Sequence, residues 1–185
     1  MAILKTLRTL GLAALLLLPA QALPAPSEYQ VKAVFLFNFA RFVDWPALTF
    51  VSERAPFMLC IYGADPFGAD LDAVVQGEAV GGRPIEVRRL RDTREFRDCQ
   101  ILYIARDAER ELDQILEALD NPSTLTVSDA DGAARRGVMI RLMNVAGKIR
   151  LRINVDAARA AHLTISSNLL RSAEIVGGPG AGDGA

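Results

Sequence analysis

Few side chains in this 185-residue sequence have the types and spacing that catalysis or metal binding requires. The chain contains one histidine, His162, and two cysteines, Cys60 and Cys99. Zinc sites of the Cys/His type and HExxH metalloprotease centres need more such ligands than this chain supplies. The sequence also lacks a Walker phosphate-binding loop and a Gly-x-Ser-x-Gly nucleophile elbow. We therefore expect a protein that is not an enzyme and that uses no cofactor.

The charged residues are nearly balanced, with 21 Lys and Arg against 22 Asp and Glu. A general nucleic-acid binder carries a basic excess, so we do not expect DNA or RNA as a partner. Arginines cluster between residues 83 and 97, but acidic residues are interleaved with them. This mixture is typical of a solvated face with local ion pairs, and a phosphate-binding patch is the alternative.

Residues 129–132, Asp-Ala-Asp-Gly, resemble the middle of a calcium-binding loop. Aligning Gly132 with the glycine of such a loop places Val127 and Val138 where oxygen ligands are required. We interpret this segment as a turn.

The first 22 residues are typical of a secretory signal peptide. Lys5 and Arg8 precede an apolar run at residues 10–18, and residues 20–22, Ala-Gln-Ala, have the form of a cleavage site. An uncleaved membrane anchor is the alternative, but the run is about half of the roughly 20 residues that span a bilayer. We predict cleavage after Ala22 and export from the cytoplasm, with no membrane-spanning segment in the mature protein.

Export determines how Cys60 and Cys99 are interpreted. A periplasmic or extracellular space is oxidising, and two otherwise unpaired thiols there tend to form a disulfide. We predict that they pair and close a loop of about 40 residues. By restricting the unfolded chain, such a bond stabilises the folded state by roughly 4 kcal/mol at most. Two separate buried thiols are the alternative.

The elements that hold these residues follow from the hydrophobic pattern. Short apolar runs at 57–62, 84–90, 100–105 and 124–127 alternate with helical patterns capped by Asp65 and Asp107, and shorter helices are expected from Asp156 and from Ser166 or Ser167. This order predicts a single α/β domain at residues 23–176, with a mixed, mostly parallel sheet flanked by helices. We expect the Gly-rich residues 177–185 to form a disordered tail.

The first helix is expected at residues 28–45, where no Gly or Pro occurs. Ser27 and Gln30 have the spacing of a capping box at its start. Its apolar side is unusually large, which requires burial on more than one side or contact with another subunit. We expect Phe39, Phe42 and Trp45 to be its structural anchors.

Residues 148–155 alternate strictly between polar and apolar side chains. With residues 138–145 and the Ala-Gly turn at 146–147, this pattern predicts an antiparallel hairpin with one solvated face. We expect that face and the helix after it to bind a partner, and ordinary strand solvation is the alternative. The candidate residues are Lys148, Arg150, Arg152, Asn154 and Asp156.

Three stretches resemble the YfiR-like family of exported regulatory proteins. The first is the aromatic-rich segment 31–46, which ends in Trp-Pro. The second consists of residues 59–63 and 99–104, which carry the two cysteines. The third and most specific runs from Gly147 to Ala173 and includes Arg-Leu-Arg-Ile-Asn-Val at 150–155.

This resemblance implies a periplasmic protein that binds and represses the sensor portion of an inner-membrane diguanylate cyclase and so controls cyclic-di-GMP signalling. It also implies a homodimer and, as a second partner, an outer-membrane lipoprotein. The sequence departs from the family in two places. Residues 128–152 contain no cysteine where a relative has a second disulfide, and His162 replaces the usual glycine before Leu163, a change that is either neutral or adds pH sensitivity.

A second function remains open, that of a periplasmic small-ligand sensor or binding protein. Sheets of α/β proteins commonly bind ligands at the carboxyl ends of their strands. In this chain the loops after Tyr62, Ala105 and Val127 would form such a site.

Overall fold

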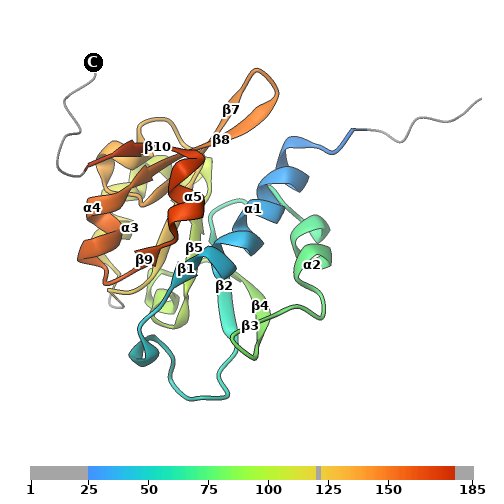
Figure 1. Cartoon of the computed structure of the whole chain (residues 1–185), viewed down its shortest axis with the longest axis vertical. Coiled ribbons are helices and arrows are strands. Elements are labelled where there is room, and N and C mark those ends of the chain that lie inside the picture. The colour runs from blue at the N-terminus through green and yellow to red at the C-terminus, as the bar shows by residue number, and fades with distance from the viewer. Residues whose placement is uncertain (1–24, 120–121, 178–185) are drawn as a thin grey trace, which may run out of the picture.

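Figure 1 shows a computed structural model of the chain, which describes residues 25–119 and 122–177. The expected signal peptide and residues 178–185 of the expected tail lie outside the described residues. The strands are β1 (Val43–Asp44), β2 (Phe57–Tyr62), β3 (Ala79–Val80), β4 (Arg83–Leu90), β5 (Ile101–Ile104), β6 (Leu125–Ser128), β7 (Ile140–Val145), β8 (Lys148–Asn154), β9 (Thr164–Ile165) and β10 (Ala173–Val176). The α-helices are α1 (Glu28–Phe42), α2 (Ala69–Val75), α3 (Leu112–Glu117), α4 (Val155–Ala160) and α5 (Ser167–Arg171).

Eight strands form one mixed sheet in the order β10-β8-β7-β6-β5-β2-β4-β3. The five neighbours from β7 to β4 run parallel to one another. Strand β8 is antiparallel to β7 and parallel to β10, and β3 is antiparallel to β4. The predicted mixed, mostly parallel sheet with an added hairpin is confirmed.

Both faces of the central sheet are covered, so β2 and β5 at its middle consist almost entirely of apolar residues. Alternate residues of β2 point to opposite faces: Leu59 and Ile61 enter one hydrophobic core, and Met58 and Cys60 enter the other. The first core is closed by α1, α2, α4 and α5, and Phe39 of α1 is fully buried in it. The second is closed by α3 and by short 3-10 helices, η3 (Thr93–Asp98), η4 (Arg106–Glu111) and η5 (Ala133–Arg136).

The first helix begins where predicted but ends three residues earlier. The capping box of Ser27 and Gln30 is present at its start. Val43 and Asp44 leave the helix and pair with β9, which forms a separate two-stranded sheet. This pairing satisfies backbone groups that a continued helix would have used, so the helix does not reach Trp45.

Asp65, Asp107 and Asp156 were expected to cap helices. These three predictions are wrong, because another residue is the N-cap of each helix. Helix α2 begins after Gly68, η4 begins after Ala105, and α4 is capped by the side chain of Asn154. Two of the aspartates bind backbone N–H groups outside a helix. Asp65 accepts from the N–H of Phe67 at 2.8 Å, and Asp107 accepts from the N–H of Ala64 at 3.1 Å.

The strand β10 was not predicted from the sequence, which placed Ala173 in a helix. Ser166 does cap α5 as expected, but this helix ends at Arg171. Residues 173–176 then pair with residues 151–154 of β8 and form the edge of the sheet.

Candidate functional site

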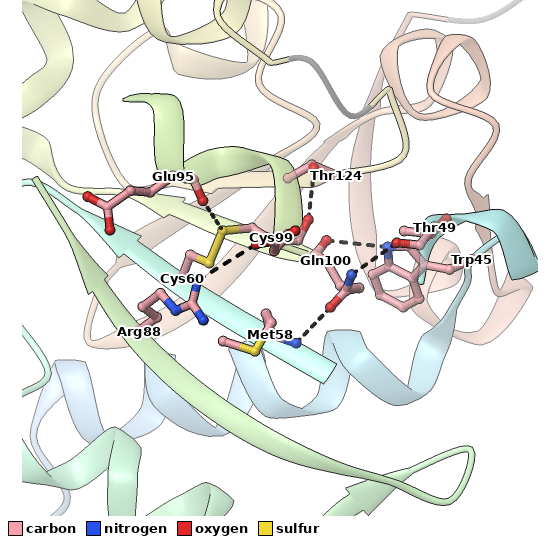
Figure 2. The surroundings of a disulfide bond; sticks show 10 residues. Trp45, Thr49, Met58, Cys60, Arg88, Glu95, Cys99, Gln100 and Thr124 are labelled. Atoms are coloured by element: carbon pink, nitrogen blue, oxygen red, sulfur yellow. Dashed lines mark hydrogen bonds and ion pairs between the residues drawn. A yellow bond between two sulfur atoms is a disulfide. The ribbon is translucent and has the colours of Figure 1, made fainter. Parts of the chain in front are cut away.

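The two cysteines form a disulfide between the middle of β2 and the segment that leads from η3 into β5 (Figure 2). The Cα atoms of Cys60 and Cys99 lie 5.8 Å apart, and both residues are fully buried. The carbonyl of Cys99 accepts a hydrogen bond from the hydroxyl of Thr124 at 2.8 Å. The predicted pairing is confirmed, and it joins β2 to the segment before its parallel neighbour β5 within the second core.

Next to the disulfide, Gln100 links the sheet to the segment after α1 (Figure 2). Its side-chain oxygen accepts from the N–H of Met58 at 2.7 Å, and its amide donates to the carbonyl of Thr49 at 3.4 Å. The indole of Trp45 donates to the Gln100 carbonyl at 3.3 Å and packs edge-on against Phe57. Trp45 is therefore held in place by both polar and apolar contacts.

The anchors proposed for α1 differ in their burial. Phe39 is fully buried, whereas Trp45 is half-buried. Phe42 keeps 39% of its surface exposed. The rings of Phe39 and Trp45 are positioned to stabilise the fold, and the ring of Phe42 faces solvent in large part.

The hairpin of β7 and β8 extends past both of its neighbouring strands. Pairing with β6 reaches only Arg141, and pairing with β10 begins at Leu151. Within the described chain, residues 142–150 therefore have only each other as strand partners, and the hairpin projects from the domain (Figure 1). Its two-residue turn places Ala146 at φ 50° and Gly147 at φ 76°, as a type I′ hairpin turn requires.

The predicted partner-binding residues of the hairpin have different environments. Lys148 and Arg150 are exposed, and no ion pair to either occurs in the described part of the chain. Arg152 is partly buried and forms an ion pair of 2.9 Å with Glu174 of β10. Asn154 caps α4 by accepting from the N–H of Ala157 at 2.9 Å. Of the four polar residues expected on this face of β8, only Lys148 and Arg150 are therefore available to a partner.

The side chain of Asp156 lies on the surface of α4. Its carboxylate is 3.7 Å from the guanidinium of Arg159, one turn along the same helix. It lies beyond the end of β8 and is separated from the projecting part of the hairpin.

His162 occupies a backbone conformation that favours glycine. Its φ is 58°, and its N–H bonds the carbonyl of Arg159 at 2.9 Å just after α4. A residue in the left-handed region commonly ends a helix, and glycine adopts this conformation without steric cost. Glycine, which the family resemblance implies at this position, would adopt this conformation without strain.

A buried ion pair between α1 and the end of β6 was not anticipated from the sequence. The ammonium of Lys32 lies 2.6 Å from Oδ2 of Asp129 and 2.5 Å from Oε1 of Glu28. The side chains of Lys32 and Asp129 are 1% and 0% exposed. The hydroxyl of Tyr29 also donates to Asp129, at 3.0 Å. Residues 130–132 form the expected bend and turn, and the side chain of Asp129 just before them also anchors the first helix.

The pKa values in this cluster follow from burial and from the Lys32 charge. Burial alone would raise the pKa of Asp129, but hydrogen bonding to Lys32 and the positive charge of that residue hold it below its usual value. The Lys32 and Asn144 hydrogen bonds lower the pKa of Glu28. Burial and the nearby Asp129 carboxylate raise the pKa of Tyr29 to about 12. Both carboxylates are therefore ionised at neutral pH.

The family of the chain follows from a match to known protein families. Residues 29–174 match the model of the YfiR/HmsC-like family. The chain belongs to this family. YfiR/HmsC-like proteins are periplasmic and regulatory rather than catalytic, and membership supports a role in cyclic-di-GMP signalling. Both the disulfide and the projecting hairpin of this YfiR/HmsC-like chain lie within the matched span.

Comparison with solved structures identifies a conserved domain protein from Vibrio cholerae O1 biovar El Tor. It superposes with a TM-score of 0.52 at 12% sequence identity, over 80% of this YfiR/HmsC-like chain and 60% of the other. This chain thus spans 60% of the length of that protein, and the similarity shows a shared fold. No curated protein matches the sequence.

No helix within residues 25–119 and 122–177 has the length and apolar character needed to cross a bilayer. The same ranges contain no cluster of three or more His, Cys, Asp or Glu side chains that could hold a metal ion.

Proposed function

We propose that this protein binds the periplasmic sensor portion of an inner-membrane diguanylate cyclase and represses it. Family membership supports the signalling role, and the projecting hairpin supplies a surface for the interaction. In this proposal the signal peptide at residues 1–22 is removed on export. The working form is a homodimer, and an outer-membrane lipoprotein is a second partner.

The observation that carries this proposal is the composition of the projecting hairpin face. Lys148 lies directly opposite Val145, and Arg150 lies opposite Met143. Side chains of directly opposed residues point to the same face, so two uncommitted cations stand beside two apolar groups. Val145 is 51% exposed. A partner surface that combines acidic and aliphatic side chains is complementary to this face.

The hairpin also borders a hollow that a partner side chain can enter. The hollow has a volume of about 500 Å³ and lies between β8 and the junction of α5 with β10. Arg150 and Arg171 line it together with Met143 and Val145. Because no described strand flanks residues 142–150 of the hairpin, a partner can dock there without disrupting the sheet.

Capture of the partner tests the binding part of the proposal. Immobilised mature protein is incubated with a detergent extract of membranes from its own organism, and the bound proteins are identified by mass spectrometry. We expect the bound fraction to contain a diguanylate cyclase with a periplasmic portion, and the Lys148→Glu/Arg150→Glu variant to capture much less of it. A bound fraction without a diguanylate cyclase, or equal capture by the variant, would contradict the proposal.

A further inference from the structure

A second cleft runs along the edge of β7 that faces away from β8. It has a volume of about 530 Å³, and residues 141–145 of β7 form one wall. Consecutive strand residues point their side chains to opposite faces of a sheet, so a cleft lined by all five lies at the strand edge. The start of α1 contributes to the opposite wall, and the amide of Asn144 reaches it by donating to Glu28 at 2.6 Å (Figure 1).

Past Arg141, where pairing with β6 ends, this edge of β7 has no strand beside it in the described chain. In a hairpin with a two-residue turn, the residues that flank the turn exchange hydrogen bonds, and bonded and non-bonded pairs then alternate. Val145 and Lys148 flank the turn, so Asn144 and the opposite residue Ile149 form a non-bonded pair. The backbone groups of Asn144 therefore point away from β8, toward the cleft.

The carbonyl of Leu142 points toward the cleft for the same reason. The N–H of Asn154 donates to the carbonyl of Met139 at 2.8 Å, which is the register that this alternation requires. Within residues 25–119 and 122–177, the Leu142 carbonyl and the backbone groups of Asn144 form no backbone hydrogen bond. The edge thus presents acceptors and a donor with the spacing of an extended strand, and such a row pairs readily with a strand of another chain.

The cleft is continuous with the hairpin face that the proposed function assigns to the partner. Met143 and Val145 line both the cleft and the hollow beside β8. A segment that lies along the β7 edge places alternate side chains on the face that carries Lys148 and Arg150. Aliphatic side chains on that segment suit Met143 and Val145, and carboxylates suit the two cations. A second copy of this chain would bring the same two cations instead.

We propose that an extended segment of the cyclase's periplasmic sensor portion adds to the β7 edge as a new strand. Its main chain bonds the carbonyl of Leu142 and the N–H and carbonyl of Asn144. Its side chains on the face of Lys148 and Arg150 are aliphatic or acidic. This inference rests on the proposed function and adds to it the mode of binding.

Proline at the two outward-facing positions of the hairpin tests the strand addition. Asn144→Pro removes the N–H that faces the cleft and places a ring at the edge, without removing a hydrogen bond of the β7–β8 ladder. Ile149→Pro makes the same change at the opposite edge of the hairpin and is the matched control. Asn144→Ala, the second control, loses the side-chain bonds to Glu28 and Gly147 but keeps the N–H.

Each immobilised variant is incubated with the detergent extract of membranes, and the captured diguanylate cyclase is quantified by mass spectrometry. We expect Asn144→Pro to capture about tenfold less cyclase than the wild type, and the two controls to capture within about twofold of it. Equal capture by Asn144→Pro and the wild type, or an equal loss in Ile149→Pro, would overturn the strand addition and leave the proposed function in place. Absence of a cyclase from the wild-type fraction would contradict the proposed function itself.

Hydrogen exchange of the wild-type protein tests the same point without a substitution, and it decides the outcome if Asn144→Pro does not fold. The amide of Asn144 should exchange rapidly in the free protein and slowly in the captured complex. Unchanged exchange at Asn144 on capture would overturn the proposal. Protection of this amide that rises with the concentration of the free protein would assign the edge to a second copy and would also overturn it.

Discussion

Cys60 and Cys99 stabilise the domain by closing a loop with a sequence separation of 39 residues. We expect the Cys60→Ala/Cys99→Ala variant to lose up to roughly 4 kcal/mol of unfolding free energy, because its unfolded chain is no longer restricted. Urea unfolding measures this loss. In the wild-type protein, labelling of the denatured, unreduced chain should find no free thiol, and labelling at either cysteine would show that the bond does not form in the periplasm.

Lys32 is the residue whose removal should be most damaging in the polar part of the core. The Lys32→Met variant leaves the buried Asp129 carboxylate without its main cation, and we expect it to lose about 3 kcal/mol of stability at pH 7. The double variant Lys32→Met/Asp129→Leu removes both charges and should recover most of this loss. Equal stability of the single and double variants would show that the pair does not act as a unit.

The contribution of Asp129 to the pH dependence of stability should have opposite signs in the wild type and in Lys32→Met. In the wild type the pKa of Asp129 is lowered by folding, so its contribution is present above the unfolded value and is lost as the pH falls below about 4. In the variant, burial without Lys32 raises the folded pKa above the unfolded value. The deficit of the variant should therefore shrink as the pH falls from 7 to 4, as measured by urea unfolding across that range.

His162 should be replaceable by glycine with a gain in stability. The backbone at this position has φ 58°, which costs a residue with a Cβ atom about 1 kcal/mol relative to glycine. We expect His162→Gly to raise the unfolding free energy by about that amount, and His162→Ala to leave it nearly unchanged. A loss of stability in His162→Gly would indicate that the imidazole makes a stabilising contact.

At the scale of elements, α1 depends on one face for its attachment to the sheet. Phe39 is fully buried, so we expect Phe39→Ala to cost about 3 to 5 kcal/mol. Phe42 is 39% exposed on the same helix, and Phe42→Ala provides the matched control with a cost of roughly 0.5 to 1 kcal/mol. Thermal unfolding distinguishes the two, and similar melting temperatures would contradict the assigned packing of α1.

Elements with a strong local pattern could be predicted from the sequence. The hairpin was predicted because Lys148 to Val155 alternate strictly and a two-residue turn precedes them. The start of α1 was predicted from Ser27 and Gln30, whose side chains form the capping box. Strands β2 and β5 were evident as short apolar runs, because both of their faces are buried.

Features that depend on distant partners could not be predicted in the same way. Lys32 and Asp129 are 97 residues apart, and neither position carries a local signal of the contact. Strand β10 is short, and it is formed by pairing with the edge that β8 provides. Arg152 and Asn154 fit the alternating pattern, but their pairing with Glu174 and with the start of α4 became clear only from the structure.

At the scale of the whole molecule, the projecting hairpin is the proposed contact with a membrane partner. Lys148 and Arg150 can be reversed in charge without breaking any ion pair in the described residues, so Lys148→Glu/Arg150→Glu should unfold within a few degrees of the wild type. The Arg54→Glu/Arg91→Glu variant reverses the same charge at two other exposed positions. Comparing the two variants distinguishes an effect of the hairpin surface from a general effect of net charge.

The most direct test is the cyclic-di-GMP synthesis of detergent-solubilised membranes from a strain that lacks this protein. Purified wild-type protein and the two charge-reversal variants are added separately, and the conversion of GTP is measured. The proposal predicts that wild-type protein and Arg54→Glu/Arg91→Glu inhibit synthesis, and that Lys148→Glu/Arg150→Glu does not. Synthesis that is unaffected by the wild-type protein, or inhibited equally by all three, would contradict repression through the hairpin.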